Sequence, residues 1–301
     1  MSTVVGFDTI HKSYGATVAL RGVSFAVRPG EVFGLLGPNG AGKSSLIRIL
    51  MDIIRADSGT VTLFGASHNR RDLNRVGYLP EERGLYTKQK VIHVMTYFAM
   101  LKGLSRRDAR ERSREWLRRI ELPEVESWRV ERLSKGMSQK VQLAATLLTE
   151  PELCVLDEPF SGLDPLNVRL VREMIAERRR DGRTTILSTH LMNQVEAACD
   201  RVGMVHLGRL VVYGTVSEVR ARYSLPEIRL TTDGSAPPEL PGVSTVTAEG
   251  DATWRLLLEP GTRARDVLAA LVQAGTSVER FEKVLAPIED IFVRVVRGES
   301  S

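Results

Sequence analysis

The run Gly37-Pro-Asn-Gly-Ala-Gly-Lys-Ser44 has the residue types and the spacing of a loop that binds nucleotide phosphates. Its three glycines allow the backbone to approach a phosphate and to turn its N–H groups inward. Lys43 would place a positive charge on the β- and γ-phosphates, and the hydroxyl of Ser44 would ligate Mg²⁺. A glycine-rich turn with a solvated lysine is the alternative interpretation.

The segments on either side of this loop agree with the phosphate-binding interpretation. Glu31–Leu36 is apolar enough for a buried strand, and Ser45–Met51 is expected to be a helix. The positive end of that helix would point at a bound anion. A strand, a loop and a helix in this order are the context that the motif requires.

Two adjacent carboxylates follow a second apolar run, Leu153–Leu156. This run predicts a buried strand whose carboxyl end delivers Asp157 and Glu158, and ligands of open α/β sheets bind at such ends. Asp157 would hold Mg²⁺ directly or through water, and Glu158 would polarise the water that attacks the γ-phosphate. An ordinary acidic strand end is the alternative.

A histidine follows a third expected strand in Ile186-Leu-Ser-Thr-His190. His190 could donate a hydrogen bond to a γ-phosphate oxygen, although such a histidine can also be a purely structural partner. Ser134 and Gly136 lie just before the helical pattern Gln139–Leu148, where they could form another anion site or a plain helix cap. Two phosphate-binding helix starts exceed what one nucleotide needs, so the second favours ATP held by another subunit.

With these runs in this order, the chain resembles the ATP-binding subunit of an ATP-binding-cassette (ABC) transporter from about residue 3 to residue 220. The resemblance identifies a Walker A loop, a signature at Leu133–Met137, a Walker B strand and a D-loop at Ser161–Asp164. It makes His190 the switch histidine and Tyr14 the aromatic residue that stacks on adenine. Taken alone, Tyr14 could equally be a packing residue.

The resemblance implies ATP and Mg²⁺ as cofactors, and it assigns a role to each matching residue. The catalytic residues would be Glu158, His190 and Lys43. The metal ligands would be Ser44, Asp157 and Glu81. The nucleotide would be bound by Tyr14, Gly37, Pro38, Asn39, Gly40, Ala41, Gly42, Lys43, Ser44, Ser45, Ser134, Gly136 and Asp164.

Three positions depart from the family pattern. Glu81 stands where the family usually has glutamine, and an ionised glutamate only accepts hydrogen bonds and adds negative charge near the γ-phosphate. In the signature, Lys135 replaces a glycine and Met137 replaces a glutamine. The contacts of Ser134 and Gly136 remain available, while Lys135 would point to solvent or add charge beside the facing phosphates.

The composition is that of a globular protein with a sizeable core: 301 residues, 43% hydrophobic and 26% charged. A net charge of +5 does not by itself indicate nucleic acid or lipid as a partner. Two distant cysteines favour a reducing compartment, and no apolar run reaches the length of a membrane span. We therefore expect a peripheral protein on the cytoplasmic face of the membrane, bound through an integral-membrane permease.

Alternating strands and helices predict an α/β fold with a mainly parallel sheet, N-terminal antiparallel strands and a helical subdomain at about 85–150. We expect an ATPase domain over 1–222 and a small α+β domain over 223–301. Strands are expected at Glu227–Thr232, Val243–Thr247 and Thr253–Leu258, with a helix at Thr262–Ala274. This extension resembles that of bacterial ABC-2-type exporter ATPases, and its role is open between packing, dimer stabilisation and regulation.

The function implied is a Mg²⁺-dependent ATPase that powers an exporter as a head-to-tail homodimer or heterodimer. A non-transport ATPase of the same family, acting on translation or DNA, is the alternative, and so is a P-loop switch or kinase. The arginine-rich stretch 106–119 is interpreted as a solvated helix face, with a surface facing the membrane or permease as the second reading. Sparse aromatic residues argue against direct nucleic-acid binding there.

Overall fold

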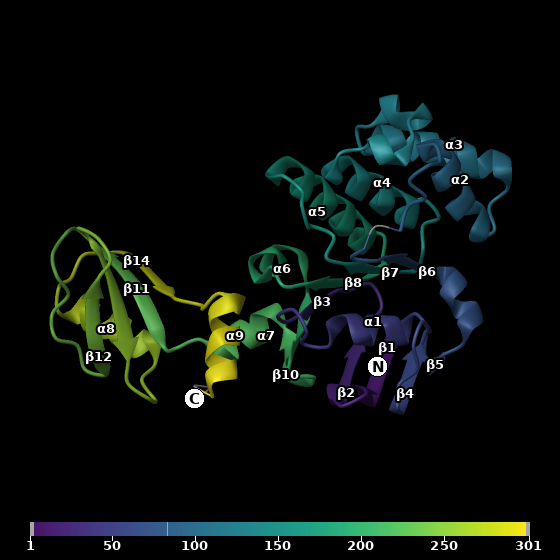
Figure 1. The fold of residues 1–301 in the computed structure, drawn as a ribbon. Helices are drawn as coiled ribbons and strands as arrows, with labels where there is room; N and C mark the ends of the chain where they lie inside the picture. Colours follow the sequence, from purple (N-terminus) through teal and green to yellow (C-terminus); the bar gives the residue numbers. More distant parts are fainter. Residues whose placement is uncertain (1–2, 83, 299–301) are drawn as a thin grey trace. The chain divides into compact units, whose positions relative to one another are not determined.

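The computed structural model describes residues 3–82 and 84–298, and the chain divides into two compact units, Met1–Val216 and Ser217–Ser301. Each unit has its own hydrophobic core. Figure 1 shows the helices and strands of both units. No helix in the described part of the chain is both long and apolar enough to cross a bilayer. The division falls at the start of helix α7, and the domain boundary near residue 223 stays a prediction.

A six-stranded sheet forms the centre of the first unit, with the strand order β10-β9-β3-β8-β7-β6. All neighbouring pairs are parallel except β10 and β9. The strands are β3 (Val32–Leu36), β6 (Val76–Leu79), β7 (Leu153–Asp157), β8 (Thr184–Thr189), β9 (Arg201–His206) and β10 (Arg209–Thr215). Every residue of β3, β7 and β8 is buried, as expected for parallel strands covered on both faces.

A second, antiparallel sheet has the order β2-β1-β4-β5. Its strands are β1 (Val5–Tyr14), β2 (Thr17–Val27), β4 (Ser58–Leu63) and β5 (Ala66–Ser67). Helix α1 (Lys43–Leu50) lies between the two sheets, and its residues Leu46, Ile47 and Leu50 share one core with both (Figure 1). This packing fixes the N-terminal end of α1 next to the carboxyl end of β3.

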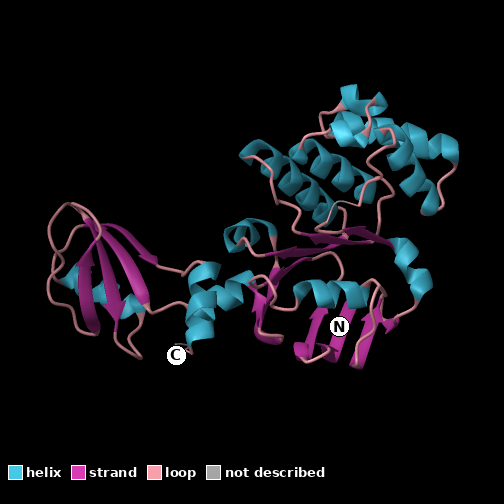
Figure 2. Ribbon diagram, viewed as in Figure 1, coloured by secondary structure: helices cyan, strands magenta, loops and turns pink. Residues whose placement is uncertain are grey.

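Helices cover the other face of the central sheet (Figure 2). On this side α4 (Lys135–Leu147), α5 (Pro165–Arg180) and α6 (Met192–Ala198) contact the sheet, while α2 (Val91–Leu101) and α3 (Arg106–Arg119) pack against α4. Short 3-10 turns occur at Arg70–Arg75, Pro123–Ser127 and Val130–Arg132. In α3, the residues Ala109, Trp116 and Leu117 are buried, while the arginines on the opposite side are exposed.

The second unit contains a four-stranded antiparallel sheet, β12-β13-β11-β14. Its elements are α7 (Val216–Tyr223), β11 (Glu227–Thr232), β12 (Val243–Ala248), β13 (Thr253–Leu258), α8 (Ala264–Gln273), β14 (Val278–Lys283) and α9 (Ile288–Arg297). Val267 and Leu271 of α8 pack on Ile228, Leu230 and Leu256 of the sheet. The core of this unit is small and lies between α8 and one face of the sheet.

This architecture is the predicted α/β fold, with differences at helix starts. Helix α4 begins at Lys135, four residues before the predicted start, because the Ser134 hydroxyl accepts a hydrogen bond from the Met137 N–H and caps the helix. Helix α5 begins at Pro165 in the same way, with Asp164 as its cap. A capping side chain lets a helix start where the apolar pattern has not yet begun.

Candidate functional site

The phosphate-type loop connects β3 to α1, and two of its glycines have no room for a side chain. Gly37 has φ of 149°, and a Cβ there would overlap the carbonyl oxygen of Val205. Gly42 has φ of 114°, and a Cβ would lie 2.8 Å from the carbonyl oxygen of Ala19. The loop is therefore pressed against β2 and the end of β9, and only glycine permits that course.

The loop forms one wall of a cavity of about 340 Å³. Carboxylates from two neighbouring strands form the opposite wall: Glu81 follows β6, and Asp157 and Glu158 stand at the end of β7. The complete lining is Ala19, Pro38, Asn39, Gly40, Ala41, Gly42, Lys43, Ser44, Ser45, Glu81, Asp157 and Glu158. The structure thus brings together the loop and three of the four predicted acidic residues, Asp164 being the exception. Ala19, from β2, was not anticipated.

Lys43 is buried in this cavity at the first turn of α1. Its Nζ donates hydrogen bonds to the carbonyl oxygens of Gly37 at 2.6 Å and Pro38 at 3.2 Å. Burial lowers the pKa of Lys43, whereas Glu158, Asp157 and Glu81 act in the opposite direction. The ammonium is held against its own loop and faces carboxylates, where it can meet the negative charge of a phosphate.

Glu158 is held by the end of β8. One carboxylate oxygen accepts from the backbone N–H of His190 at 3.0 Å and lies 2.7 Å from the His190 ring Nδ1. The other oxygen accepts from the Thr189 hydroxyl at 3.0 Å. The Glu158 backbone has φ of 49°, a strained value for a side chain of this size. Burial raises the pKa of the neighbouring Asp157.

Thr189 is a functional candidate that the sequence reasoning missed. Its hydroxyl contacts Glu158 and also accepts from the Leu191 N–H at 3.0 Å, so it ties the carboxylate to the turn after β8. The available signal was its place next to His190 at a strand end. Hydroxyl residues are common in strands, so the sequence did not distinguish this one.

The residues predicted to hold magnesium present a suitable set of atoms. Ser44, Glu81 and Asp157 line the same cavity and offer one hydroxyl and two carboxylates, which are oxygen ligands of the kind that Mg²⁺ prefers. Among residues 3–82 and 84–298, no group of three or more His, Cys, Asp or Glu side chains could hold a metal ion. The side chains of Ser44, Glu81 and Asp157 would hold the ion, which would supply positive charge next to the phosphates.

Tyr14 is the last residue of β1 and lies next to Ser45, at the end of the phosphate-type loop. Its hydroxyl lies 3.3 Å from the Ser45 hydroxyl, and Lys12 places its ammonium 5.6 Å from the ring centroid. The side chain is 45% exposed, so a face of the ring is available to a base. This position is compatible with stacking next to a nucleotide whose phosphates occupy the loop.

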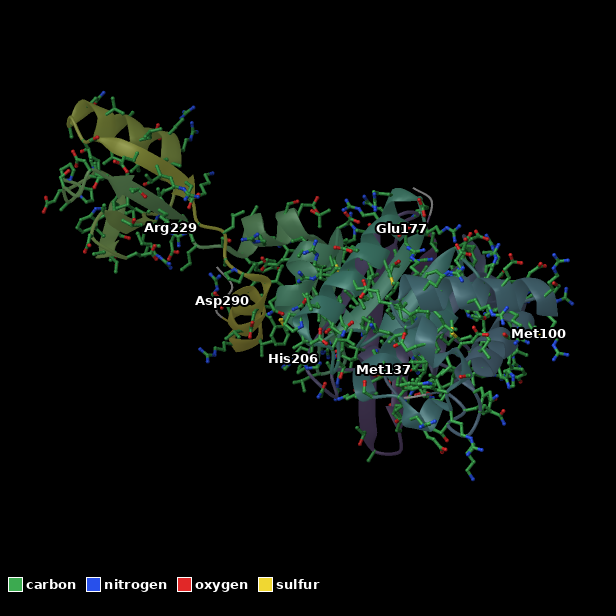
Figure 3. The ribbon with its side chains drawn as sticks, turned by 90° about the horizontal axis from the view of Figure 1, so that it is seen from above. Met100, Met137, Glu177, His206, Arg229 and Asp290 are labelled. Carbon is green, nitrogen blue, oxygen red and sulfur yellow. The ribbon has the colours of Figure 1, made fainter. Side chains whose placement is uncertain are left out.

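The remaining predicted residues form a second cluster, which does not line this cavity. Ser134 caps α4, and Gly136 lies in its first turn, where a Cβ added to it would come within 4.0 Å of the carbonyl oxygen of Gly162. The Lys135 side chain lies directly over Gly162, and Asp164 caps α5 through the Asn167 N–H at 2.9 Å. In Figure 3 the label Met137 marks this signature segment. The signature and the D-loop therefore pack together within one chain.

Both parts of the chain resemble known protein families. A family model described as ABC transporter matches residues 20–161, and one described as the C-terminal domain of DrrA1-3-like ATP-binding proteins matches residues 214–296. The chain is 33% identical over 296 residues to the uncharacterized ABC transporter ATP-binding protein YhaQ of Bacillus subtilis, covering 96% of this chain and 97% of that protein.

Two further similarities extend the comparison. The daunorubicin resistance ATP-binding protein DrrA3 of Streptomyces coeruleorubidus is 32% identical over 305 residues, covering 97% of this chain and 96% of that protein. A solved ATP binding subunit of an ABC transporter is 32% identical with a TM-score of 0.68, covering 73% of this chain and 93% of that one. The chain therefore belongs to the family of ABC transporter ATP-binding proteins and is an ABC ATPase.

Proposed function

We propose that this chain powers export through a separate integral-membrane permease, to which it binds on the cytoplasmic face of the membrane. The resistance protein DrrA3, similar over nearly the whole chain, and the matching C-terminal domain support export as the direction. The observation that carries the proposal is that the loop, with Lys43, and the carboxylates Asp157 and Glu158 line the same cavity.

The triphosphate of ATP would bind along the loop from Gly37 to Ser45. Backbone N–H groups and the N-terminal end of α1 favour phosphate there, and Lys43 would contact the β- and γ-phosphates. Ser44, Asp157 and Glu81 would hold Mg²⁺, which when bound neutralises charge on the phosphates. Tyr14 would stack on the adenine.

Glu158 would act as the base that polarises the attacking water. Its contacts with Thr189 and His190 fix the carboxylate at the cavity wall, so that little reorganisation is needed when water binds. His190 would hold Glu158 in place through Nδ1 and would donate to the γ-phosphate from its other ring nitrogen once ATP is bound. These are roles of this chain's own residues, and they need a closed site that excludes bulk water.

Closure requires a second subunit, either another copy or a related chain. Ser134, Gly136 and Asp164 do not line the cavity in which their own chain would bind phosphates, although the Ser134 hydroxyl and the N-terminal end of α4 suit an anion. In a head-to-tail pair, the capped start of α4 in one subunit would cover the ATP bound by the other. Hydrolysis would remove the ligand that joins the two subunits and allow them to separate.

An apolar groove next to Glu81 supports a permease as partner. Its volume is about 300 Å³, and it is lined by Gly77, Tyr78, Pro80, Gly84, Leu85, Phe98, Leu101, Lys102, Gln142, Ala145, Thr146 and Thr149. Exposed side chains extend it, with Tyr86 and Tyr97 in edge-to-face contact at 5.9 Å and Met100 about one helical turn after Tyr97 in α2. Apolar surface of this kind marks a protein interface. We assign it to a segment of the permease.

A charge placed in the groove tests this partner. Leu101→Glu should reduce the amount of permease that copurifies with the chain by at least about tenfold, because a carboxylate would have to be buried in the contact. Ile53→Glu is the matched control, since Ile53 is 58% exposed and Leu101 59% exposed. The melting temperature of each isolated variant verifies folding. Equal copurification of the two variants would remove the groove from the permease contact.

A further inference from the structure

The two edge strands of the sheet in the second unit differ sharply in charge. The edge strand β14 carries charged residues at four of its six positions: Glu279, Arg280, Glu282 and Lys283. The other edge strand, β12, is Val-Ser-Thr-Val-Thr-Ala and has neither a charged residue nor a proline. Charges and prolines protect sheet edges from pairing with other chains. One edge of this sheet is thus protected, and the other is open to pairing.

Strand β12 also contributes little to the core of its own unit. All of its residues from Ser244 to Ala248 are exposed, and Val246 is 42% exposed. In β13, by contrast, Leu256 and Leu258 are buried. Within the described residues of this unit, no strand pairs with the outer side of β12. Its residues have high β-propensity and are free for another contact.

The hydrogen-bond pattern shows which backbone groups of β12 point outward. The Glu249 N–H donates to the Thr253 carbonyl at 2.8 Å, so this pair is a hydrogen-bonded pair of the antiparallel ladder. Because bonded and non-bonded pairs alternate, Thr247 also directs its backbone groups toward β13. Val246 and Ala248 then direct their N–H and C=O groups toward the open side.

We propose that β12 pairs antiparallel with β12 of a second copy of this chain, about a two-fold axis at Val246. The inference rests on the proposed function in one respect: a working pair of ATPase subunits supplies the second copy. In this register Val246 faces itself, so its outward backbone groups meet those of the second copy. Ser244 faces Ala248 and lies at the register shift of β12 between Val243 and Thr245. Glu249 faces Val243, and no charged side chain meets its like. The edge is self-complementary, which favours a second copy over an unrelated strand.

The pairing is weak on its own and acts when the two copies are already held together. A contact between two six-residue strands buries much less than the roughly 1,200 Å² of a stable interface. Two subunits joined through ATP or through a permease have a high effective concentration for each other, at which weak pairing becomes populated. The two four-stranded sheets would then form one continuous sheet.

Single cysteines in the chain, assembled with its permease so that two copies are held together, test both the pairing and its register. In the proposed register the two Cα atoms at position 246 are about 5.5 Å apart, within the range for a disulfide. Position 244 is about 14 Å from its own copy, four residues along the strand. Mild oxidation of Val246→Cys should therefore give at least about tenfold more cross-linked dimer than Ser244→Cys or Ala248→Cys alone. A mixture of Ser244→Cys and Ala248→Cys should cross-link.

The native chain is the background control, because Cys154 and Cys199 are buried. A proline at position 246 would remove an outward N–H and leave the ladder with β13 intact, so it should abolish the cross-link between Ser244→Cys and Ala248→Cys. Lys283→Pro does the same on the outer side of β14 and should leave that cross-link unchanged. Equal yields from Val246→Cys and Ser244→Cys, or no product from Val246→Cys, would overturn the proposal.

The cross-linking experiment also distinguishes a failure of the edge pairing from a failure of the proposed function. In the assembly with the permease, Val246→Cys combined with Ser134→Arg should still cross-link, because the permease holds the two copies together and the edge and the ATP contact lie in different units. If ATP fails to join the subunits but the register-specific cross-link persists, only the head-to-tail mechanism fails. If ATP joins them and the cross-link never forms, only the edge pairing fails.

Discussion

In the proposed mechanism, Glu158 is the residue on which the chemistry depends most. Three hydrogen-bond contacts from Thr189 and His190 hold its carboxylate at the wall of the phosphate cavity. We expect Glu158→Gln to bind ATP normally and to lose about 10²–10⁴ in turnover, because an amide cannot take a proton from water. Phosphate release under single turnover and equilibrium ATP binding are the two measurements. Wild-type turnover in this variant would exclude Glu158 as the base.

Glu81 adds a third carboxylate to a cavity that holds one lysine. We expect Glu81→Gln to raise the Mg²⁺ concentration for half-maximal ATPase activity by about tenfold, because an ionised oxygen ligand is replaced by a neutral one. Glu82→Gln is the matched control, since Glu82 is next in the chain but does not line the cavity. A Mg²⁺ titration with the same midpoint for wild type and Glu81→Gln would show that Glu81 is not a ligand.

At the scale of elements, the start of α4 combines a cap with a proposed nucleotide contact. Ser134 and Ser105 cap α4 and α3 in the same way, each accepting a backbone N–H at 3.2 Å. Both Ser134→Ala and Ser105→Ala should lower the free energy of unfolding by about 1 kcal/mol in urea titrations. Only Ser134→Ala should also lose at least about tenfold in ATP turnover, because a hydrogen bond to a charged phosphate contributes about 1.5–3 kcal/mol.

Ser105→Ala serves as the control for lost helix stability in this comparison. If both variants lost the same fraction of ATPase activity, the effect would come from stability, and Ser134 would be a cap without a role at the nucleotide. If neither variant lost activity, the composite site would lack its serine contact.

The elements also show what the sequence could predict. The loop after β3 and the acids after β7 were found because parallel strand ends converge and their motifs have fixed spacing. The early start of α4 was missed because its first turn, Lys135–Ser138, lacks the apolar periodicity of a helix, and only the cap by Ser134, one of two interpretations of that serine, defines the start. The contacts of Thr189 with Glu158 and of Lys135 with Gly162 join residues 27–31 positions apart, and no local pattern predicts them.

On the scale of the whole molecule, one chain contains half of each proposed active site. The cavity holds the groups that would bind ATP and magnesium, while Ser134, Gly136 and Asp164 lie in a separate cluster of the same unit. A pair of subunits would bring each cavity to the other's cluster. Activity would then require association, and association would require ATP.

The most direct measurement of this claim is the molecular mass of Glu158→Gln in sedimentation equilibrium with ATP and Mg²⁺. We predict a dimer with ATP and a return toward monomer when the nucleotide is removed. Ser134→Arg in the same background should bind ATP with unchanged affinity and remain monomeric. The arginine side chain would block the start of α4, which is the surface that would cover the ATP of the other subunit. A Glu158→Gln protein that is saturated with ATP and still strictly monomeric, with or without its permease, would contradict the account.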